Sequence, residues 1–289
     1  MKWPALTALA SVGKYSESHQ VSEDGPVKLQ WRYFLLAVGF FTRLPVPALP
    51  DFQEAELNHA ARYFPLVGLL VGLMAAVTWW LASWVLPPAL AVLCSMAATI
   101  YVTGAFHEDG LADSADGLGG GIDRARQLEI MQDSRLGSYG AIALVGVLLF
   151  KFQALSALTP AILPFALIAA HALSRLAAVY IMATTSYVRS AGKSKPLATT
   201  LPRQDLWLAS AFGLLCWLGF AAMLGVNHSA MAAIRFLLVT ALPVLGIWWW
   251  WRRLILRNLQ GYTGDTLGAT QQLTELAFYF GLLAWEHFV

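Results

Sequence analysis

The chain has 289 residues, of which 58% are hydrophobic and only 12% are charged, and its mean hydropathy is +0.58. This composition excludes an ordinary soluble globular domain and indicates an integral membrane protein. The formal net charge of +2 gives no sign of a polyanionic partner such as nucleic acid. The two cysteines, Cys94 and Cys216, each lie inside an apolar run, so they predict neither a disulfide framework nor a zinc site.

Seven apolar stretches are long enough to cross a hydrocarbon core about 30 Å thick. They are residues 64–86, 89–106, 138–158, 161–183, 206–226, 232–251 and 269–289, the last interrupted by Gln271, Gln272 and Glu275. The stretch 33–41 is too short to span and predicts an interfacial or re-entrant helix near the N-terminus. Residues 1–30 are polar and predict a solvated tail, with a cleaved signal as the alternative. We therefore expect an all-α fold, a polytopic transmembrane bundle of about seven spans, with residues 31–289 as its single transmembrane catalytic domain.

Basic residues fall in alternate connections between these spans, which predicts the orientation of the chain. The connections at 87–88, 159–160 and 227–228 carry no Lys or Arg. The others carry Arg32, Arg43 and Arg62, then Arg124, Arg126 and Arg135, then Arg189, Lys193, Lys195 and Arg203, and finally Arg252, Arg253 and Arg257. Because Lys and Arg concentrate in loops that stay in the cytoplasm, every sizeable loop is expected on that side.

Carboxylates are densest just after the second predicted span. Seven of the seventeen lie between residues 107 and 133, namely Glu108, Asp109, Asp113, Asp116, Asp123, Glu129 and Asp133. The spacing i, i+4, i+7 of Asp109, Asp113 and Asp116 places them on one face of a helix continuing from that span. Like charges on adjacent turns repel, so a compensating divalent cation is expected, and Mg²⁺ with its oxygen ligands fits best.

Glycines and arginines accompany these acids and favour phosphate chemistry. Gly110, Gly117 and the run 119–121 leave room for phosphate oxygens, while Arg124, Arg126 and Arg135 supply donors for them. Metal, arginine and glycine together suit phosphoryl transfer, although a plain acidic loop between two spans remains the alternative. No Walker-type phosphate loop is present, so an ATPase motor is not indicated.

A second candidate segment, residues 260–268, joins the sixth and seventh predicted spans on the same side. Asp265 is expected to complete the metal shell, with Thr263 and Thr266 binding phosphate or nucleoside, unless Asp265 or Thr266 merely caps the next helix. Within the spans, Lys151 predicts an interhelical partner and His171 a neutral, hydrogen-bonded role. Arg175 either points at the site or extends to the headgroups.

The strings FHEDGLADSADG (106–117) and LEIMQDSRLGSYG (128–140) resemble the cobalamin synthase family, the adenosylcobinamide-GDP ribazoletransferases. Segments 41–47, 62–68 and 261–269 support this resemblance, which runs from about Trp31 to the C-terminus. It implies transfer of the adenosylcobinamide phosphoryl group from adenosylcobinamide-GDP to α-ribazole or its 5′-phosphate. GMP would leave and adenosylcobalamin or its 5′-phosphate would form, in the last assembly step of vitamin B12 synthesis, with Mg²⁺ required.

The resemblance also implies site residues and a location. Asp109, Asp113 and Asp116 would bind Mg²⁺, with Glu108 a weaker candidate, while Asp133 and Asp265 would be further ligands or the base. Substrate phosphate would be held by Arg135, Arg124, Gly117 and Thr263. The enzyme would lie in the bacterial inner membrane, as a multi-pass protein with its active site facing the cytoplasm. Partners beyond substrates and membrane lipid, such as a second copy or other corrinoid-pathway enzymes, stay open.

Two other functions fit part of the pattern. A CDP-alcohol phosphotransferase is suggested because residues 113–117 reproduce the Asp-x-x-Asp-Gly opening of its motif, but the continuation of that motif is missing. A cation transporter would use the acids as a vestibule and predicts carboxylates within the spans. The clustering of the acids at one membrane border and the lack of Asp inside the spans speak against that function.

Overall fold

A computed structural model describes residues 25–50, 53, 56–188 and 201–288. Within them the regular structure is helical, apart from one isolated bridge between Tyr187 and Tyr262, so the predicted all-α fold is confirmed. The predicted tail up to residue 24 and the basic residues Arg189, Lys193 and Lys195 lie outside the described part. The helices are α2 (Pro26–Phe41), α3 (Glu56–Ala60), η1 (Ala61–Tyr63), α4 (Phe64–Ala82), α5 (Pro88–Thr103), α6 (Phe106–Gly120), α7 (Arg124–Ile130), α8 (Ser138–Ala157), α9 (Leu163–Thr184), α10 (Arg203–Asn227), α11 (Ala230–Leu259) and α12 (Gly264–Phe288).

Five helical stretches among the described residues are long and apolar enough to cross a membrane. They are Glu56–Ala82, which joins α3, η1 and α4, and the single helices α8, α9, α10 and α11. The bent pair α5 and α6 makes a sixth if it is counted as one span. The sequence predicted about seven, and the difference lies in the second and the seventh predicted spans.

The second predicted span, 89–106, is broken near its end. Gly104 (φ 68°) and Ala105 (φ 59°) both adopt the left-handed conformation, which stops α5. The N–H of Ala105 donates to Ile100 O and that of Gly104 to Tyr101 O, the pattern of a Schellman motif. After this break α6 runs at 85° to α5. The expectation that the acidic row continues the second span was therefore wrong, because the row lies on a separate helix.

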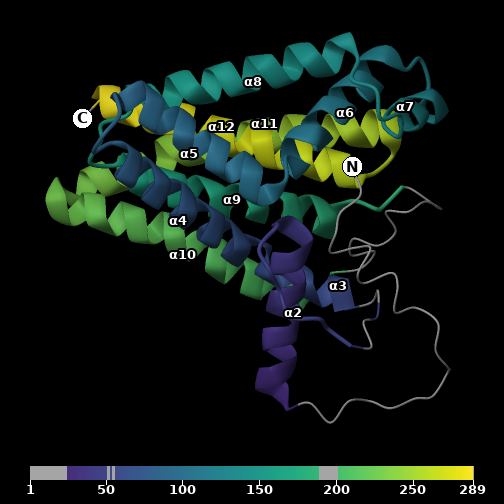
Figure 1. Ribbon diagram of the computed structural model, residues 1–289, viewed down its shortest axis with the longest axis horizontal. Coiled ribbons are helices and arrows are strands. Elements are labelled where there is room, and N and C mark those ends of the chain that lie inside the picture. Colours follow the sequence, from purple (N-terminus) through teal and green to yellow (C-terminus); the bar gives the residue numbers. More distant parts are fainter. Residues whose placement is uncertain (1–24, 51–52, 54–55, 189–200, 289) are drawn as a thin grey trace.

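The seventh predicted span corresponds to α12, which is too polar to pass as a membrane span on composition. Its polar residues nevertheless avoid the lipid, because Gln271, Gln272 and Glu275 are all buried. Helix α12 packs against α6, α8, α9 and α11 and lies at the centre of the bundle (Figure 1). Neighbouring helices thus shield the polar groups that depress its hydropathy.

The long helices α8 to α12 run roughly along one direction, and α2 runs across it (Figure 1). At one end, Glu286 near the end of α12 accepts hydrogen bonds from the backbone N–H of Thr159, and Trp285 donates to Ala232 O. The neutral turns around residues 159 and 228 therefore gather at this end. Helices α6 and α7 and the start of α12 lie at the other end. The length of α12, at about 1.5 Å per residue, separates the two ends by some 36 Å. The stretch 33–41, predicted as an interfacial or re-entrant helix, is the second half of α2, which already begins at Pro26 inside the predicted tail.

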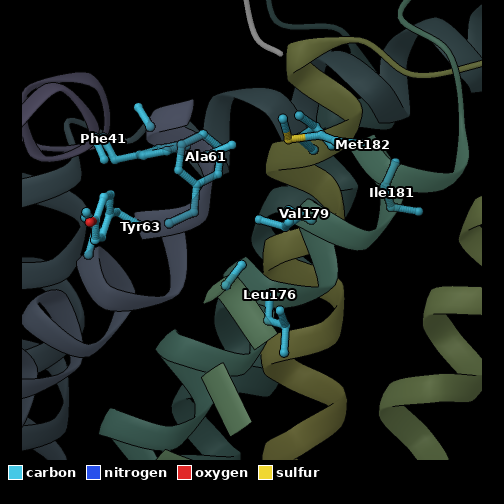
Figure 2. Close-up of a cluster of buried hydrophobic side chains, with 14 of the residues drawn as sticks. Phe41, Ala61, Tyr63, Leu176, Val179, Ile181 and Met182 are labelled. Atoms are coloured by element: carbon cyan, nitrogen blue, oxygen red, sulfur yellow. The ribbon is translucent and has the colours of Figure 1, made fainter. Parts of the chain in front are cut away.

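A hydrophobic core at the α6 end joins α2, η1, α9 and α12. Phe41, Tyr63, Val179 and Met182 are among its buried side chains (Figure 2). Close approach of α4 and α9 supports it, because a Cβ atom at Gly68 would lie only 2.2 Å from His171 O. Small residues at such crossings are the usual means of helix association in lipid. This core thus packs together the helices at the end of the bundle that carries the acidic helix α6.

Candidate functional site

The three aspartates on one face of α6 meet three different environments. Asp109 is exposed, Asp113 is half-buried and Asp116 is only 8% exposed. Exposure of this acidic face therefore decreases along α6, and the last of the three, Asp116, is buried where α6 packs against α8. The row predicted from spacing exists, but its members are not equivalent.

Helices α6 and α12 touch at glycines. A Cβ atom at Gly110 would lie 2.7 Å from Asp265 O, and one at Gly268 would lie 3.1 Å from His107 O. The backbone of Asp265 therefore lies against the turn of α6 that carries Asp109 and Asp113. The two segments singled out in the sequence, 107–139 and 260–268, meet at this point.

The turn that precedes α12 is fixed by its own hydrogen bonds. Thr263 N–H donates to Thr266 Oγ1 at 2.9 Å, and Thr266 N–H donates to Thr263 Oγ1 at 3.3 Å, a reciprocal cap of the helix N-terminus. Thr263 is fully buried, and its hydroxyl also donates to Asp265 Oδ2 at 3.3 Å. The structure thus places Thr263 inside the turn, not on its surface.

The backbone just before that turn is also held by hydrogen bonds. Tyr262 N–H donates to Ser186 O, and Val188 N–H donates to Tyr262 O. A Cβ atom at Gly261 would lie 2.1 Å from Ser186 O, so only glycine permits this pairing. Burial raises the pKa of the Tyr262 hydroxyl, with Tyr187 adding to the effect. These contacts therefore fix the backbone that leads to Asp265.

Asp116 is a capping residue in this structure. Its Oδ2 accepts the N–H of Gly137 at 2.7 Å, and its Oδ1 accepts the N–H of Gly140 at 2.8 Å. Gly137 is the N-cap of α8 and has no side chain of its own to fill that role. Both carboxylate oxygens of Asp116 are thus engaged by the start of α8.

Glu108 faces inward, away from Asp109. It is 6% exposed, and its Oε1 accepts a hydrogen bond from Gln272 Nε2 at 3.0 Å. Its Oε2 is buried and has no hydrogen-bond partner among the described residues. Glu108 therefore belongs to the interior polar network of the bundle.

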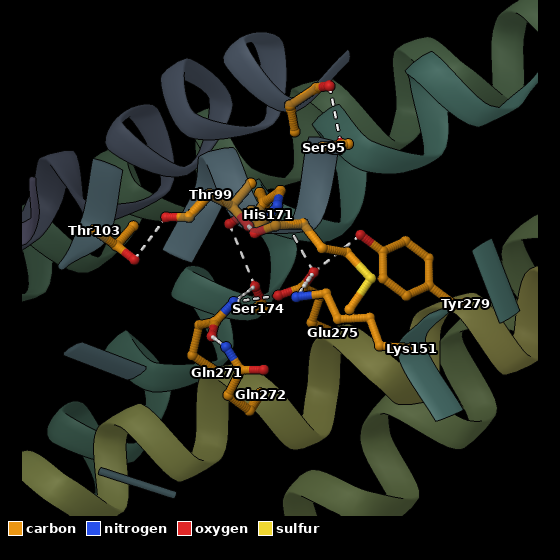
Figure 3. A network of polar contacts seen from close by, with 12 residues as sticks. Ser95, Thr99, Thr103, Lys151, His171, Ser174, Gln271, Gln272, Glu275 and Tyr279 are labelled. Atoms are coloured by element: carbon orange, nitrogen blue, oxygen red, sulfur yellow. Dashed lines mark hydrogen bonds and ion pairs between the residues drawn. The ribbon is translucent and has the colours of Figure 1, made fainter. Parts of the chain in front are cut away.

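That network is centred on Glu275. Lys151 Nζ lies 2.7 Å from Glu275 Oε1, Tyr279 donates to the same oxygen at 3.0 Å, and Gln271 donates to Glu275 Oε2 at 2.6 Å. Figure 3 shows these side chains converging from α8 and α12. The predicted interhelical partner of Lys151 is confirmed, since it is Glu275.

Arg175 and His171 extend the network on α9. Arg175 is only 2% exposed and donates to His171 O at 3.0 Å, so it does not extend to the headgroups. His171 is also buried, with Nε2 3.7 Å from Glu275 Oε1. Four of the six buried side-chain atoms without a hydrogen-bond partner in the described part belong to this network: Glu108 Oε2, His171 Nε2, Arg175 Nε and Gln272 Oε1.

The arginines near α6 have distinct partners. Arg124 Nε donates to Leu259 O at 2.8 Å, which ties α7 to the C-terminal end of α11. Arg135 is exposed and pairs with Asp133, with Nη2 2.5 Å from Oδ2. The hydrogen bonds from Arg135 lower the pKa of Asp133 to about 2, and Asp133 in turn raises the pKa of Arg135.

Gly117 is enclosed by protein. A Cβ atom there would lie 2.5 Å from Met131 Cγ and 2.8 Å from Gln127 O, so its missing side chain makes room for α7. This packing gives Gly117 a structural purpose that does not involve phosphate. Across the described residues, no three His, Cys, Asp or Glu side chains gather closely enough to hold a metal ion by themselves.

Sequence reasoning missed the residues that orient Asp116 and Glu108. The N–H groups of Gly137 and Gly140 donate hydrogen bonds to Asp116, and Gln272 Nε2 donates to Glu108. One signal was available, because a helix that starts at Gly137 without a Ser, Thr, Asp or Asn cap needs an acceptor from elsewhere. For Gln272 the signal was its polar side chain in an otherwise apolar span.

Comparisons with known proteins show the family of this chain. A model of the family described as cobalamin-5-phosphate synthase matches residues 33–283. The chain is 47% identical to the adenosylcobinamide-GDP ribazoletransferase of Ralstonia pickettii over 88% of this chain and 96% of the relative. It is 49% identical to that of Leptothrix cholodnii (88% and 95% covered) and 45% identical to that of Shewanella amazonensis (89% and 96%). No solved structure matches.

Proposed function

The chain belongs to the cobalamin-5-phosphate synthase family, and on that premise we propose that it acts as an adenosylcobinamide-GDP ribazoletransferase. It transfers the adenosylcobinamide phosphoryl group to α-ribazole or its 5′-phosphate and releases GMP. The observation that carries this proposal is the meeting of α6 and the start of α12 at Gly110, because it joins the two motifs of the resemblance in one place.

The reaction exchanges one phosphorus–oxygen bond for another. A hydroxyl oxygen of the ribazole ribose bonds to the cobinamide-side phosphorus, and the bond from that phosphorus to the bridging oxygen breaks. GMP leaves with the bridging oxygen, and the hydroxyl proton passes to a base. Such a reaction asks the protein chiefly to position the reactants and to neutralise charge.

Mg²⁺ is part of the proposal, and the available donors fit it. Asp109 and Asp113 lie on adjacent turns of α6, and Asp265 starts the helix that touches α6 between them. Mg²⁺ usually takes one or two carboxylates together with waters and substrate phosphates, so a closed group of three protein ligands is not required. Asp109 and Asp113 would hold the ion, which would neutralise charge on the diphosphate, and Asp265 would lie beside them as the base. Glu108 and Asp116 face other partners and are left out of this set.

Asp265 is the better candidate for the base. A general base works best when its pKa lies near the working pH. Asp133 is far from that condition, because Arg135 lowers its pKa to about 2. We assign Asp133 instead the task of orienting Arg135, whose guanidinium would bind substrate phosphate.

The active site is proposed to face the cytoplasm from a bacterial inner membrane. Arg124, Arg126 and Arg135 flank α6, whereas the turns around residues 159 and 228 at the opposite end of the bundle carry no Lys or Arg. This asymmetry supports the assignment through the concentration of basic residues on the cytoplasmic side.

The test is a direct assay in lipid. Purified protein receives adenosylcobinamide-GDP, α-ribazole or its 5′-phosphate, and Mg²⁺, and the products are GMP and a corrinoid with a completed nucleotide loop, identified by mass spectrometry. Asp113→Asn should lower turnover by about a hundredfold, whereas Gly146→Ala, with nothing within 4 Å of the new Cβ, should behave as wild type. Absence of GMP from the wild-type protein would refute the function. Turnover that survives a chelator would refute the Mg²⁺ requirement and leave the proposed reaction standing.

A further inference from the structure

Asp116 has its negative charge compensated by the protein itself. Its two oxygens accept the N–H groups of Gly137 and Gly140, at 2.7 and 2.8 Å. These groups belong to the first turn of α8, where unpaired N–H groups and the helix dipole favour an anion. The repulsion that a row of carboxylates creates is thus relieved at Asp116 without a metal ion.

The contact is closely fitted and depends on glycine on the α8 side. A Cβ atom at Gly137 would lie 2.4 Å from Asp116 Oδ1, and one at Gly140 would lie 2.3 Å from Asp116 Oδ2. At Gly140 the added atom would also lie 2.9 Å from Ala112 O. Any side chain at Gly140 must therefore push α8 away from α6 and break the contact.

The contact also closes the segment between the two helices. Helix α6 ends at Gly120 and α8 begins at Ser138, so Asp116 ties together the ends of a loop that contains α7, Asp133 and Arg135. We propose that Asp116 is a positioning residue that fixes the start of α8, and through it the arginine-bearing segment 131–137, and that it is not a ligand of the metal. This inference rests on the proposed function, because Arg135 is there the donor to substrate phosphate.

The two roles of Asp116 predict different results for changes on the opposite helix. If Asp116 acts through the cap, Gly140→Ala should reproduce the effect of Asp116→Asn, although it changes no charge and no carboxylate. If Asp116 binds the metal, only Asp116→Asn should alter the metal requirement. Gly146→Ala serves as the matched control on α8, since nothing lies within 4 Å of its Cβ position.

The first measurement is amide hydrogen exchange of the substrate-free protein in lipid. Asp116→Asn and Gly140→Ala should each accelerate exchange in the peptide that spans residues 131–141 by about tenfold, while Gly146→Ala should not. Unchanged exchange in Asp116→Asn would overturn the proposal. Because no substrate is present, this result does not depend on the proposed function.

The second measurement is steady-state kinetics with adenosylcobinamide-GDP at varied Mg²⁺. Both variants should raise the KM for the diphosphate substrate by about tenfold, because the phosphate-binding segment is displaced, and the Mg²⁺ concentration for half-maximal rate should stay as in wild type. A tenfold or larger rise in that Mg²⁺ concentration for Asp116→Asn alone would make Asp116 a ligand and refute the inference. If Asp116→Asn does not fold, Gly140→Ala still decides, since a wild-type KM in that variant would also refute it. A wild-type protein that forms no GMP would instead refute the proposed function.

Discussion

The ion pair between Lys151 and Glu275 offers the sharpest test of how the bundle is held together. Both side chains are at most 5% exposed, and among the described residues Glu275 is the only partner of the Lys151 ammonium. Lys151→Met leaves the buried carboxylate without its cation, and Glu275→Gln leaves the buried ammonium without its anion. Removing one partner of a buried pair costs about 3–5 kcal/mol. We expect the lower end for Lys151→Met, because Gln271 and Tyr279 still donate to Glu275.

Thermal unfolding in lipid nanodiscs, followed by tryptophan fluorescence, measures these effects. A loss of about 3 kcal/mol corresponds to a fall in Tm of about 6–12 °C for a chain of this size. The double variant Lys151→Met/Glu275→Gln leaves no unpaired charge at this position, so it should lose clearly less than the sum of the two single changes. An exposed pair, Arg126 and Glu129 at 2.8 Å, is the control, and Arg126→Gln should cost no more than about 0.5 kcal/mol. Additive losses in the double variant, or single losses no larger than the control, would refute the reasoning.

Three further changes test the packing and the site. Gly68→Ala places a Cβ atom 2.2 Å from His171 O and should lower Tm by several degrees. The control Gly246→Ala, with nothing within 4 Å of the new Cβ, should not lower Tm. Equal Tm values for the two variants would contradict the α4–α9 contact. Gly110→Ala should push α6 from Asp265 and abolish most GMP release while the protein stays folded, and wild-type turnover would separate α12 from the site. Asp133→Asn should leave the acid limb of the pH–rate profile between about pH 5 and 8 in place, because a carboxyl with pKa about 2 is ionised throughout that range. A shifted limb would restore Asp133 as a candidate base.

Hydropathy predicted the spans well where each helix lies against lipid or other apolar helices. The stretch 138–158 corresponds to α8 at Ser138–Ala157, and 161–183 corresponds to α9 at Leu163–Thr184. The agreement has a physical cause, because a segment in lipid must satisfy its backbone hydrogen bonds internally and so becomes helical wherever it is apolar enough.

Hydropathy did not predict the break after α5. Apolar residues continue through Phe106, so the average over a window does not register a turn made by two left-handed residues. Gly104 signals a helix end, but alanine rarely adopts a positive φ, so the sequence did not predict the left-handed conformation of Ala105. The start of α2 at Pro26 was also missed, because its polar residues have partners distant in sequence. Gln30, for example, accepts hydrogen bonds from Arg62 and Tyr63.

The spacing of Asp109, Asp113 and Asp116 fixed their common face but not their surroundings. Those depend on which helices pack around α6, and the partners come from 20 or more positions away in the chain. Sequence periodicity carries no information about such contacts. The same limit applies to Glu108, whose partner Gln272 lies on α12.

The interior network and the acidic face of α6 are joined through neighbouring residues. Glu108 accepts from Gln272, Gln272 donates to Gln271, and Gln271 donates to Glu275, so a chain of hydrogen bonds leads from the buried ion pair to α6. An apolar side chain in place of Glu108 would still fill space, but it would leave the rotation of α6 about its axis weakly determined, because apolar contacts are not directional. A hydrogen bond to a fixed amide specifies that rotation, and with it the outward direction of Asp109. The polar residues that make α12 a poor membrane span are thus the ones that orient the helix on which the proposed chemistry depends.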